Sequence, residues 1–187
     1  IFKADPADSG ALQNAWITSL FEDHTGVLWV GTRGGLHRYD VARGKFVSIP
    51  LDNEALSVSA ITEDLQHHIW VGTQQAGLYK KTGTSSEWRQ YRFDPADSRS
   101  VSSNDIFVLY TDDIGRVWIG TRDNGLNRYD AMADNFIRYQ PTPGNPYSIS
   151  GLSIRCIRQY KTELWIGTVN NGLNRLDPLT GRFNSYQ

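Results

Sequence analysis

The histidines and the single cysteine are the side chains of this 187-residue chain best suited to metal binding or nucleophilic catalysis. A metal site needs three or four ligands that converge with a recognisable spacing, which His24, His37, His67 and His68 do not show. His67 and His68 are adjacent and point in different directions, as is typical of a solvated turn. Cys156 lies in an apolar segment, where we expect a small buried side chain without a histidine to activate it. The sequence therefore predicts no metal site, no cofactor and no nucleophilic cysteine.

Paired acidic residues could supply general acid–base chemistry, and three such pairs recur along the chain. They are Glu22 and Asp23, Glu63 and Asp64, and Asp112 and Asp113. Because each pair occupies the same place in a repeated unit, we expect the carboxylates to close a turn by local hydrogen bonds. The Asp-rich turn at 111–115 resembles a calcium loop but lacks the ligand count. With no GxSxG elbow and no P-loop, the sequence predicts no catalytic residue.

The elements that carry these residues repeat four times, at a period of about 40–50 residues that is typical of solenoids and propellers. Each copy has Trp, an aliphatic residue, Gly and Thr, then Gly-Leu, then a downstream aromatic residue. We expect the Trp and the Leu of each copy to form the core between neighbouring units. These residues are Trp29 and Leu36, Trp70 and Leu78, Trp118 and Leu126, and Trp165 and Leu173.

Each copy is predicted to hold four short antiparallel strands, which in the first copy cover 16–23, 28–32, 35–40 and 45–49. The strands are joined by a first, a second and a third turn rich in Gly, Asp and Asn. Four strands at this period indicate an all-β chain that forms a β-propeller segment of four four-stranded antiparallel blades. A β-sandwich or two packed meanders would not need one motif at a fixed period.

The predicted organisation is a single propeller segment over residues 1–187, with repeats at about 10–50, 51–98, 99–146 and 147–187. Residues 1–9 resemble 91–98, so we expect them to be the end of a preceding blade strand and an interblade loop. Three arrangements remain open: a slice of a larger propeller, a ring closed by two copies, or an unusually small ring. An open blade would expose an apolar face, so we expect self-association, with a dimer as the simplest form.

The composition excludes several classes of partner. Nineteen basic and twenty acidic residues give a net charge of −1, which provides no field to attract nucleic acid or an anionic membrane. One cysteine allows no intramolecular disulfide, and no run of about 20 apolar residues is present for membrane insertion. The chain opens with Ile1, so we expect it to be cut from a longer protein.

The motifs "SLFEDHTGVLWVGTRGGLHRYD" and "VLYTDDIGRVWIGTRDNGLNRYD" resemble the two-component regulator propeller repeat. Two copies depart from it: His67 stands where a turn Gly is expected, and the fourth copy has a shorter first turn without the acidic pair. The resemblance implies the periplasmic sensor of a bacterial membrane protein, whose output is a histidine kinase, a hybrid two-component system or a cyclic-dinucleotide enzyme. It also implies ligands related to carbohydrate breakdown products and no enzymatic activity in this segment.

The second turns differ most between copies, and in a propeller they share one face with the connections between blades, which is usually the binding face. Amides and arginines suit a hydroxyl-rich ligand because amides both donate and accept hydrogen bonds. The predicted ligand-binding residues are Arg33, Gln74, Gln75, Arg122, Asp123, Asn124, Asn170 and Asn171, with Asn14, Ser103 and Asn104 on the same face. The alternative is that Asn and Asn-Gly only satisfy turn geometry.

Three hypotheses for function follow from the sequence. The first is a sensor module for a small molecule or an oligosaccharide. The second is a scaffold for protein interaction or dimerisation, in which open blade ends pair between chains. The third, a propeller lyase or hydrolase, would need a converging cluster of histidines and acids at the channel, which the first strands of the repeats do not offer.

Overall fold

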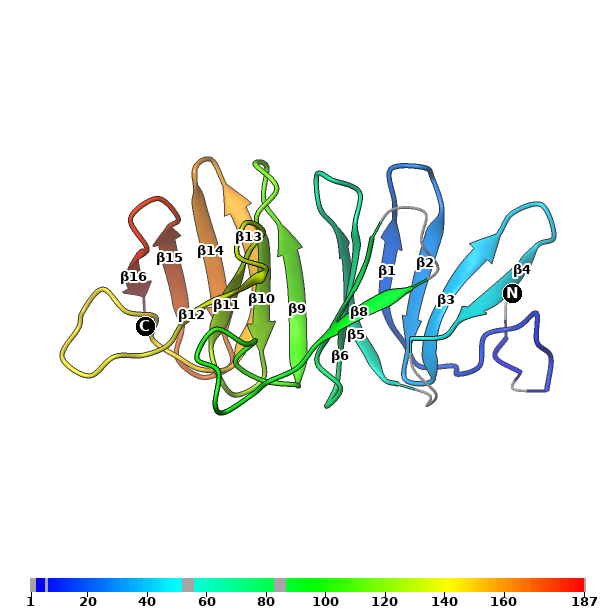
Figure 1. Ribbon diagram of the computed structural model, residues 1–187, viewed down its shortest axis with the longest axis horizontal. Helices are drawn as coiled ribbons and strands as arrows, with labels where there is room; N and C mark the ends of the chain where they lie inside the picture. Colours follow the sequence, from blue (N-terminus) through cyan, green and yellow to red (C-terminus); the bar gives the residue numbers. More distant parts are fainter. Residues whose placement is uncertain (1–2, 6, 52–55, 83–86, 187) are drawn as a thin grey trace.

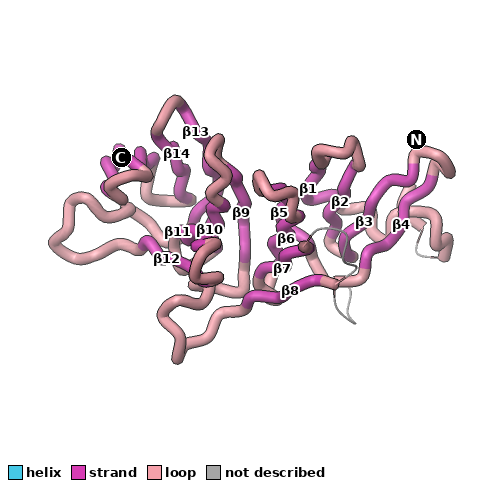
Figure 2. The backbone as a smooth tube through the Cα atoms, turned by 45° about the horizontal axis from the view of Figure 1, so that its top comes forward, coloured by secondary structure: helices cyan, strands magenta, loops and turns pink. Residues whose placement is uncertain are grey.

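The computed structural model describes residues 3–5, 7–51, 56–82 and 87–186, and all of its regular structure is β-strand (Figures 1 and 2). Sixteen strands form four antiparallel sheets, each ordered as in the sequence, which we call blades 1 to 4. Blade 1 holds β1 (Ile17–Glu22), β2 (Leu28–Thr32), β3 (Gly35–Asp40) and β4 (Lys45–Ile49). Blade 2 holds β5 (Val58–Glu63), β6 (Ile69–Thr73), β7 (Leu78–Lys81) and β8 (Trp88–Tyr91). Blade 3 holds β9 (Ile106–Thr111), β10 (Val117–Thr121), β11 (Leu126–Asp130) and β12 (Asn135–Tyr139). Blade 4 holds β13 (Ile154–Tyr160), β14 (Glu163–Thr168), β15 (Leu173–Asp177) and β16 (Arg182–Tyr186).

The blades lie in a row in chain order, with the two chain ends at opposite ends of the row (Figure 1). Strands β1, β5, β9 and β13, the first of each blade, lie next to one another along the row. This confirms the all-β propeller segment of four antiparallel blades. The row is open, so the unusually small ring is not formed. Within the described residues, no helix is long and apolar enough to cross a membrane.

The first turn of blades 1 to 3 is built around one aspartate. Asp23 Oδ1 accepts the backbone N–H groups of Thr25 and Val27, and its Oδ2 accepts the indole N–H of Trp29 at 2.8 Å. The same bond joins Asp64 to Trp70 at 2.8 Å. It recurs between Asp112 and Trp118 at 2.9 Å in blade 3. The aspartate thus closes the turn and fixes the tryptophan, which confirms the turn-closing role for Asp23, Asp64 and Asp112, one member of each acidic pair.

Blade 4 shows what happens without this aspartate. By strand register Tyr160 takes its place, paired with Glu163 across a turn that is one residue shorter. The indole Nε1 of Trp165 is buried and has no hydrogen-bond partner. The shorter turn predicted for the fourth copy therefore leaves an unsatisfied donor in the blade.

Neighbouring blades approach closely because the glycine of each Trp-aliphatic-Gly-Thr motif receives a side chain from the next blade. A Cβ added to Gly31 would lie 2.6 Å from a methyl group of Val58, the first residue of β5. Ile106 packs in the same way on Gly72. Ile154 packs on Gly120. The repeated glycines therefore set the spacing of the blades.

The predicted interblade core is confirmed for three blades and wrong for the fourth. Trp29, Leu36, Trp70, Leu78, Trp118 and Leu126 are buried. In blade 4, Trp165 is half-buried and Leu173 is exposed, because each pair is covered by the blade that follows. The prediction of a buried Cys156 is wrong for the same reason: Cys156 is exposed on β13, opposite Gly167.

The residues before blade 1 that the structure describes, 3–5 and 7–12, form an interblade connection. The carbonyl of Gly10 accepts the N–H of Phe46, as the carbonyl of Arg99 accepts that of Phe136. Residues 3–5 and 7–12 thus lie where later connections lie. The preceding blade strand predicted within residues 1–9 falls partly on residues 1–2, which lie outside the described residues.

Candidate functional site

The interface between blades 2 and 3 is filled by aromatic rings. The ring of Trp70 lies 5.9 Å from that of Tyr91 in its own blade and 4.6 Å from that of Tyr129 in the next. Phe136 lies 5.3 Å from Tyr91 and completes the cluster. Burial raises the pKa of Tyr129 to about 12, and Asp134, which accepts its hydroxyl hydrogen at 2.6 Å, acts in the same direction. This interface is closed.

The interface between blades 1 and 2 differs at three of these four positions. By strand register Ile49 replaces Tyr91, Lys81 replaces Tyr129 and Trp88 replaces Phe136. Only the tryptophan of β2 is kept: Trp29 lies with its ring centroid 6.4 Å from that of Trp88 and the planes at 88°. Because a branched aliphatic and a lysine side chain fill less of this space than two tyrosine rings, a cavity of about 630 Å³ opens here. This is our candidate functional site.

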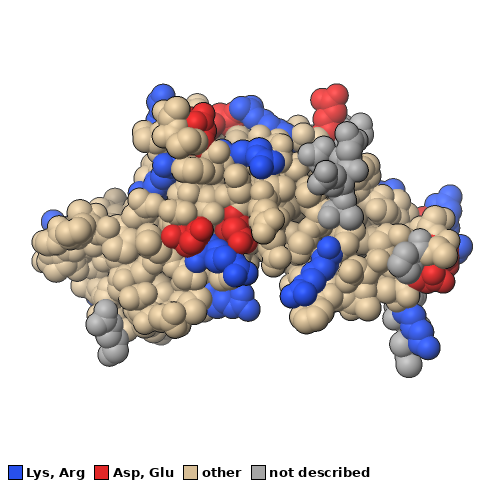
Figure 3. Space-filling model, turned by 90° about the horizontal axis from the view of Figure 1, so that it is seen from below, with Lys and Arg blue, Asp and Glu red and all other residues tan. Residues whose placement is uncertain are grey.

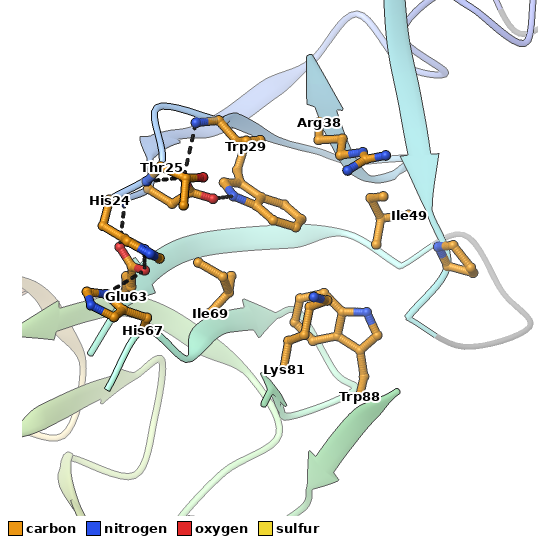
Figure 4. Close-up of a pocket in the computed structure, with 13 residues that line it drawn as sticks. His24, Thr25, Trp29, Arg38, Ile49, Glu63, His67, Ile69, Lys81 and Trp88 are labelled. Atoms are coloured by element: carbon orange, nitrogen blue, oxygen red, sulfur yellow. Dashed lines mark hydrogen bonds and ion pairs between the residues drawn. The ribbon is translucent and has the colours of Figure 1, made fainter. Parts of the chain in front are cut away.

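Figure 4 shows the cavity, which brings together side chains of both blades. Arg38 comes from β3 of blade 1, and Lys81 comes from the end of β7 in blade 2. The indoles of Trp29 and Trp88 supply its aromatic surface. A cavity of this size, apolar in most of its lining and with a few charged groups, fits a small molecule.

The carboxylates of the cavity are engaged by protein groups. Burial acts to raise the pKa of Asp23, but the hydrogen bonds from Thr25, Trp29 and two backbone N–H groups outweigh burial and lower it. Glu63 interacts with His24 and His67 at one edge of the cavity. These carboxylates lie at the His24 edge of the cavity, whereas Arg38 lies near Ile49 (Figure 4).

The histidine cluster was not predicted from the sequence. His24 from the first turn of blade 1 and His67 from that of blade 2 meet Glu63, the last residue of β5. Both histidines lie in first turns, at an edge of the cavity, so the cluster does not test the expectation for first-strand residues at the channel. His37, by contrast, is fully buried in β3, and burial lowers its pKa. His68 hydrogen-bonds to Asp64 through Nδ1.

The second turns lie together at the lower end of the row in Figure 1, opposite the first turns. Each is tied to the connection that enters its own blade: for example, the N–H of Arg33 donates to the carbonyl of Trp16, and that of Arg122 to Asp105. The structure thus brings the second-turn residues Arg33, Gln74, Gln75, Arg122, Asp123, Asn124, Asn170 and Asn171 to one end. Whether they bind a ligand stays a prediction.

The charged residues of this end pair with one another. Figure 3, which views this end, shows acidic and basic side chains side by side near its middle. Arg122 Nε lies 2.9 Å from Asp105 Oδ2, and its guanidinium covers the ring of Phe107. Burial raises the pKa of Asp105 despite this arginine. The guanidinium of Arg33 lies 3.7 Å from the ring centre of Trp16.

Hydrogen bonds at this end mainly support turns. The backbone N–H of Asn124 donates to Thr121 Oγ1 at 3.0 Å, and the backbone N–H of Asn171 donates to Thr168 Oγ1 at 3.0 Å. Gln75 holds a φ of +72°, the left-handed conformation of a turn residue. In the connections, Asn14, Ser103 and Asn104 each accept a backbone N–H within their own loop or the preceding strand end. These contacts match the alternative in which the amides satisfy turn geometry.

Comparison with known proteins places the repeat in a family. Residues 11–34 and 100–123 match the family model described as two component regulator propeller. The first and the third of the four repeats are thus similar to the two-component regulator propeller repeat. The two matched stretches are the connection, β1 and β2 of blade 1, and their equivalents in blade 3, so the match rests on the aspartate-tryptophan unit described above.

The proteins similar to this chain include signalling proteins. Over 85 residues the chain is 32% identical to Histidine kinase P4 of Formosa agariphila. This alignment covers 41% of this chain and 6% of that protein. The chain also resembles the extracellular domain of a hybrid two component system of B. thetaiotaomicron, with a TM-score of 0.81, 21% identity and coverage of 93% of this chain and 25% of that one. The chain thus spans only a small part of both proteins.

The fold is shared with an enzyme as well. Virginiamycin B lyase from Staphylococcus aureus matches with a TM-score of 0.69 and 17% identity, over 91% of this chain and 55% of the lyase. At such identities the likeness of this chain to solved structures concerns the fold alone, since one fold hosts many functions.

Proposed function

We propose that this chain is part of the extracytoplasmic sensor of a membrane-bound bacterial signalling protein, and that it binds a small hydroxyl-rich ligand without acting as an enzyme. The family repeats and the named relatives support the sensor role, and the likeness to an extracellular domain supports a place outside the cytoplasm. The observation that carries the ligand proposal is the cavity between blades 1 and 2.

The lining of the cavity favours an acidic sugar or a short acidic oligosaccharide. Trp29 and Trp88 offer flat apolar surfaces with polar edges, which suit the alternating C–H faces and hydroxyl groups of a sugar ring. Arg38 lies where a carboxylate of such a ligand would be held by charge-assisted hydrogen bonds. The interface between blades 2 and 3 also holds aromatic rings and a lysine, but there Lys80 lies over the rings of Trp70 and Tyr129, which pack against each other.

Arg38→Gln is expected to weaken binding of an acidic oligosaccharide about tenfold or more, because a charge-assisted bond is lost. Neutral oligosaccharides of the same length should lose little. Isothermal titration calorimetry over a panel of acidic and neutral oligosaccharides measures both. Arg38 is exposed, so the fold should be unaffected.

Two control variants locate the site. Arg175→Gln makes the same change at the equivalent position of blade 4, outside the cavity, and should leave affinity unchanged. Arg122→Gln changes the second-turn end. If Arg122→Gln abolishes binding and Arg38→Gln does not, the site lies at the second turns, as the sequence predicted, and the cavity proposal fails.

A second candidate function, a scaffold in which open blade ends pair between two copies, is favoured by the two terminal faces. Ile17 of β1 takes the position of Val58, Ile106 and Ile154, yet it is 40% exposed. At the other end, Gly167 has only Cys156 of its own blade within reach of an added Cβ. Ile17 of one copy therefore fits Gly167 of another.

The pairing predicts a molar mass of two chains in light scattering at micromolar concentration. Ile17→Asp should convert this species to a single chain, because it places a charge in the paired face. Val41→Asp, at an exposed apolar residue after β3, should not change the mass. A monodisperse single chain for the unmodified protein would exclude pairing of the blade ends.

A further inference from the structure

Three metal-ligating side chains from two blades converge at one edge of the cavity (Figure 4). His24, Glu63 and His67 place one ligand atom each within 4.8 Å of the others. The two imidazole rings stack with centroids 3.6 Å apart and planes at 23°. Both rings turn Nδ1 toward Glu63 Oε1, which lies 3.3 Å from Nδ1 of His67.

The backbone at His67 is unfavourable for any residue with a side chain. His67 has a φ of +63°, in the left-handed region, whereas the equivalent first-turn residues Gly26 and Gly115 have φ of +83° and +85°. A strained residue is retained where the surrounding structure or function requires its side chain. Gly would serve the turn better, so the imidazole is the feature to be explained.

The interblade hydrogen bond that Glu63 makes does not require a charged side chain. Glu63 Oε2 accepts the backbone N–H of His24, the residue after the turn aspartate of the preceding blade, at 2.9 Å. At the interface of blades 3 and 4, Gln159 takes the same position and accepts the N–H of Asp113 at 2.9 Å. A neutral amide therefore makes this interblade bond, and the second oxygen of Glu63 serves the histidines.

We propose that His24, Glu63 and His67 bind a divalent transition-metal cation, for which Zn²⁺ is the best fit. Imidazole nitrogens and a carboxylate oxygen are zinc ligands at about 2.0–2.2 Å, so ligand atoms of a tetrahedral site lie about 3.3–3.5 Å apart. The separation between Glu63 and His67 already has this value. Both histidines are about half exposed, at 44% and 55% of their side chains, which leaves the fourth position to water or to a ligand.

The ion would clamp blades 1 and 2 at the edge of the cavity, since His24 belongs to the first and the other two ligands to the second. This site is independent of the ligand proposed above. Loss of zinc binding would leave that proposal intact, and the reverse also holds.

Titration of the chain with ZnCl₂ tests the site. Calorimetry should give one Zn²⁺ bound per chain, and a free Zn²⁺ concentration of 100 times Kd should raise the Tm by about 5–10 °C. Glu63→Gln keeps the interblade hydrogen bond, as Gln159 does in blade 4, but should weaken Zn²⁺ binding at least tenfold. It should remove most of the rise in Tm.

His67→Gly distinguishes a metal site from a merely structural cluster. Without metal, this variant should have a Tm equal to or above that of the unmodified chain, because it restores the turn glycine. With Zn²⁺ it should show no rise in Tm. The variant should therefore be at least as stable as the unmodified chain without Zn²⁺ and less stable than it with Zn²⁺.

His68→Arg is the matched control, because Arg116 takes this position in blade 3 and bonds to the turn aspartate there. It removes a neighbouring imidazole and should bind Zn²⁺ as the unmodified chain does. The proposal is overturned if the unmodified chain binds no Zn²⁺, or if His67→Gly and Glu63→Gln bind it unchanged.

Discussion

Asp112→Ala is expected to lower the free energy of unfolding by about 3 kcal/mol, which urea denaturation would measure. Asp112 is buried and accepts the indole N–H of Trp118 and the backbone N–H of Arg116. It also accepts the Nε–H of Arg116 at 2.6 Å. Removing the carboxylate leaves a buried donor without a partner, at about 1–3 kcal/mol, and removes charge-assisted bonds of similar size.

Asp113→Ala is the matched control for this prediction. Asp113 is adjacent and exposed, and its backbone N–H rather than its carboxylate makes the bond to Gln159. We expect a change within about 0.5 kcal/mol. Equal losses for the two variants would show that the aspartate does not act through the tryptophan, and would remove our explanation for the recurrence of the motif.

Gly125→Ala is expected to destabilise the chain by more than 3 kcal/mol, whereas Gly144→Ala should cost about 1 kcal/mol. Both glycines have left-handed backbone, with φ of +83° and +78°. A Cβ at Gly125 would lie 2.4 Å from the carbonyl oxygen of Tyr139, while one at Gly144 would meet nothing within 4 Å. The comparison therefore separates the cost of the backbone conformation from that of the clash.

The Gly125 clash falls at an interface, which enlarges its effect. Gly125 N–H donates to the carbonyl of Leu152, in the connection that enters blade 4, at 2.7 Å. Relief of the clash would move this donor and disturb the contact between blades 3 and 4. Similar denaturation midpoints for Gly125→Ala and Gly144→Ala would contradict this packing.

Features that repeat were predictable because they depend on local pattern. The Trp-aliphatic-Gly-Thr strand and its aspartate lie within one turn of each other in the sequence, and the same hydrogen bond forms in three blades. Burial of Trp165, Leu173 and Cys156 was wrongly predicted, because it depends on a neighbouring blade and not on the residues of the fourth copy.

The cavity was not predicted, although a signal for it exists. Aligning the four copies shows Ile49 and Lys81 at positions where other copies carry larger aromatic or apolar side chains. The histidine cluster is harder to predict from the sequence. Residues 24 and 67 occupy different positions in their turns, and they meet only because one turn lies over the next when blades stack. Leu65 lies over Gly115 in the same way between blades 2 and 3.

The structure changes the balance between the two candidate ligand sites. At the second-turn end, Arg122 is engaged by Asp105 and Phe107, and the side-chain amide of Asn124 donates to Asp123. Between blades 1 and 2, aromatic faces and cations from two blades surround open space. We therefore place the function of this chain at an interface between blades, where the repeat is broken, and not at its variable turns.

The indole N–H resonances of the tryptophans test this placement most directly, in a titration with an acidic oligosaccharide followed by NMR. Trp29 and Trp88 line the cavity, and Trp16 lies at the second-turn end beneath Arg33. We predict that the signals of Trp29 and Trp88 shift on ligand binding and that the signal of Trp16 does not. A shift of Trp16 with no change at Trp29 and Trp88 would contradict the account.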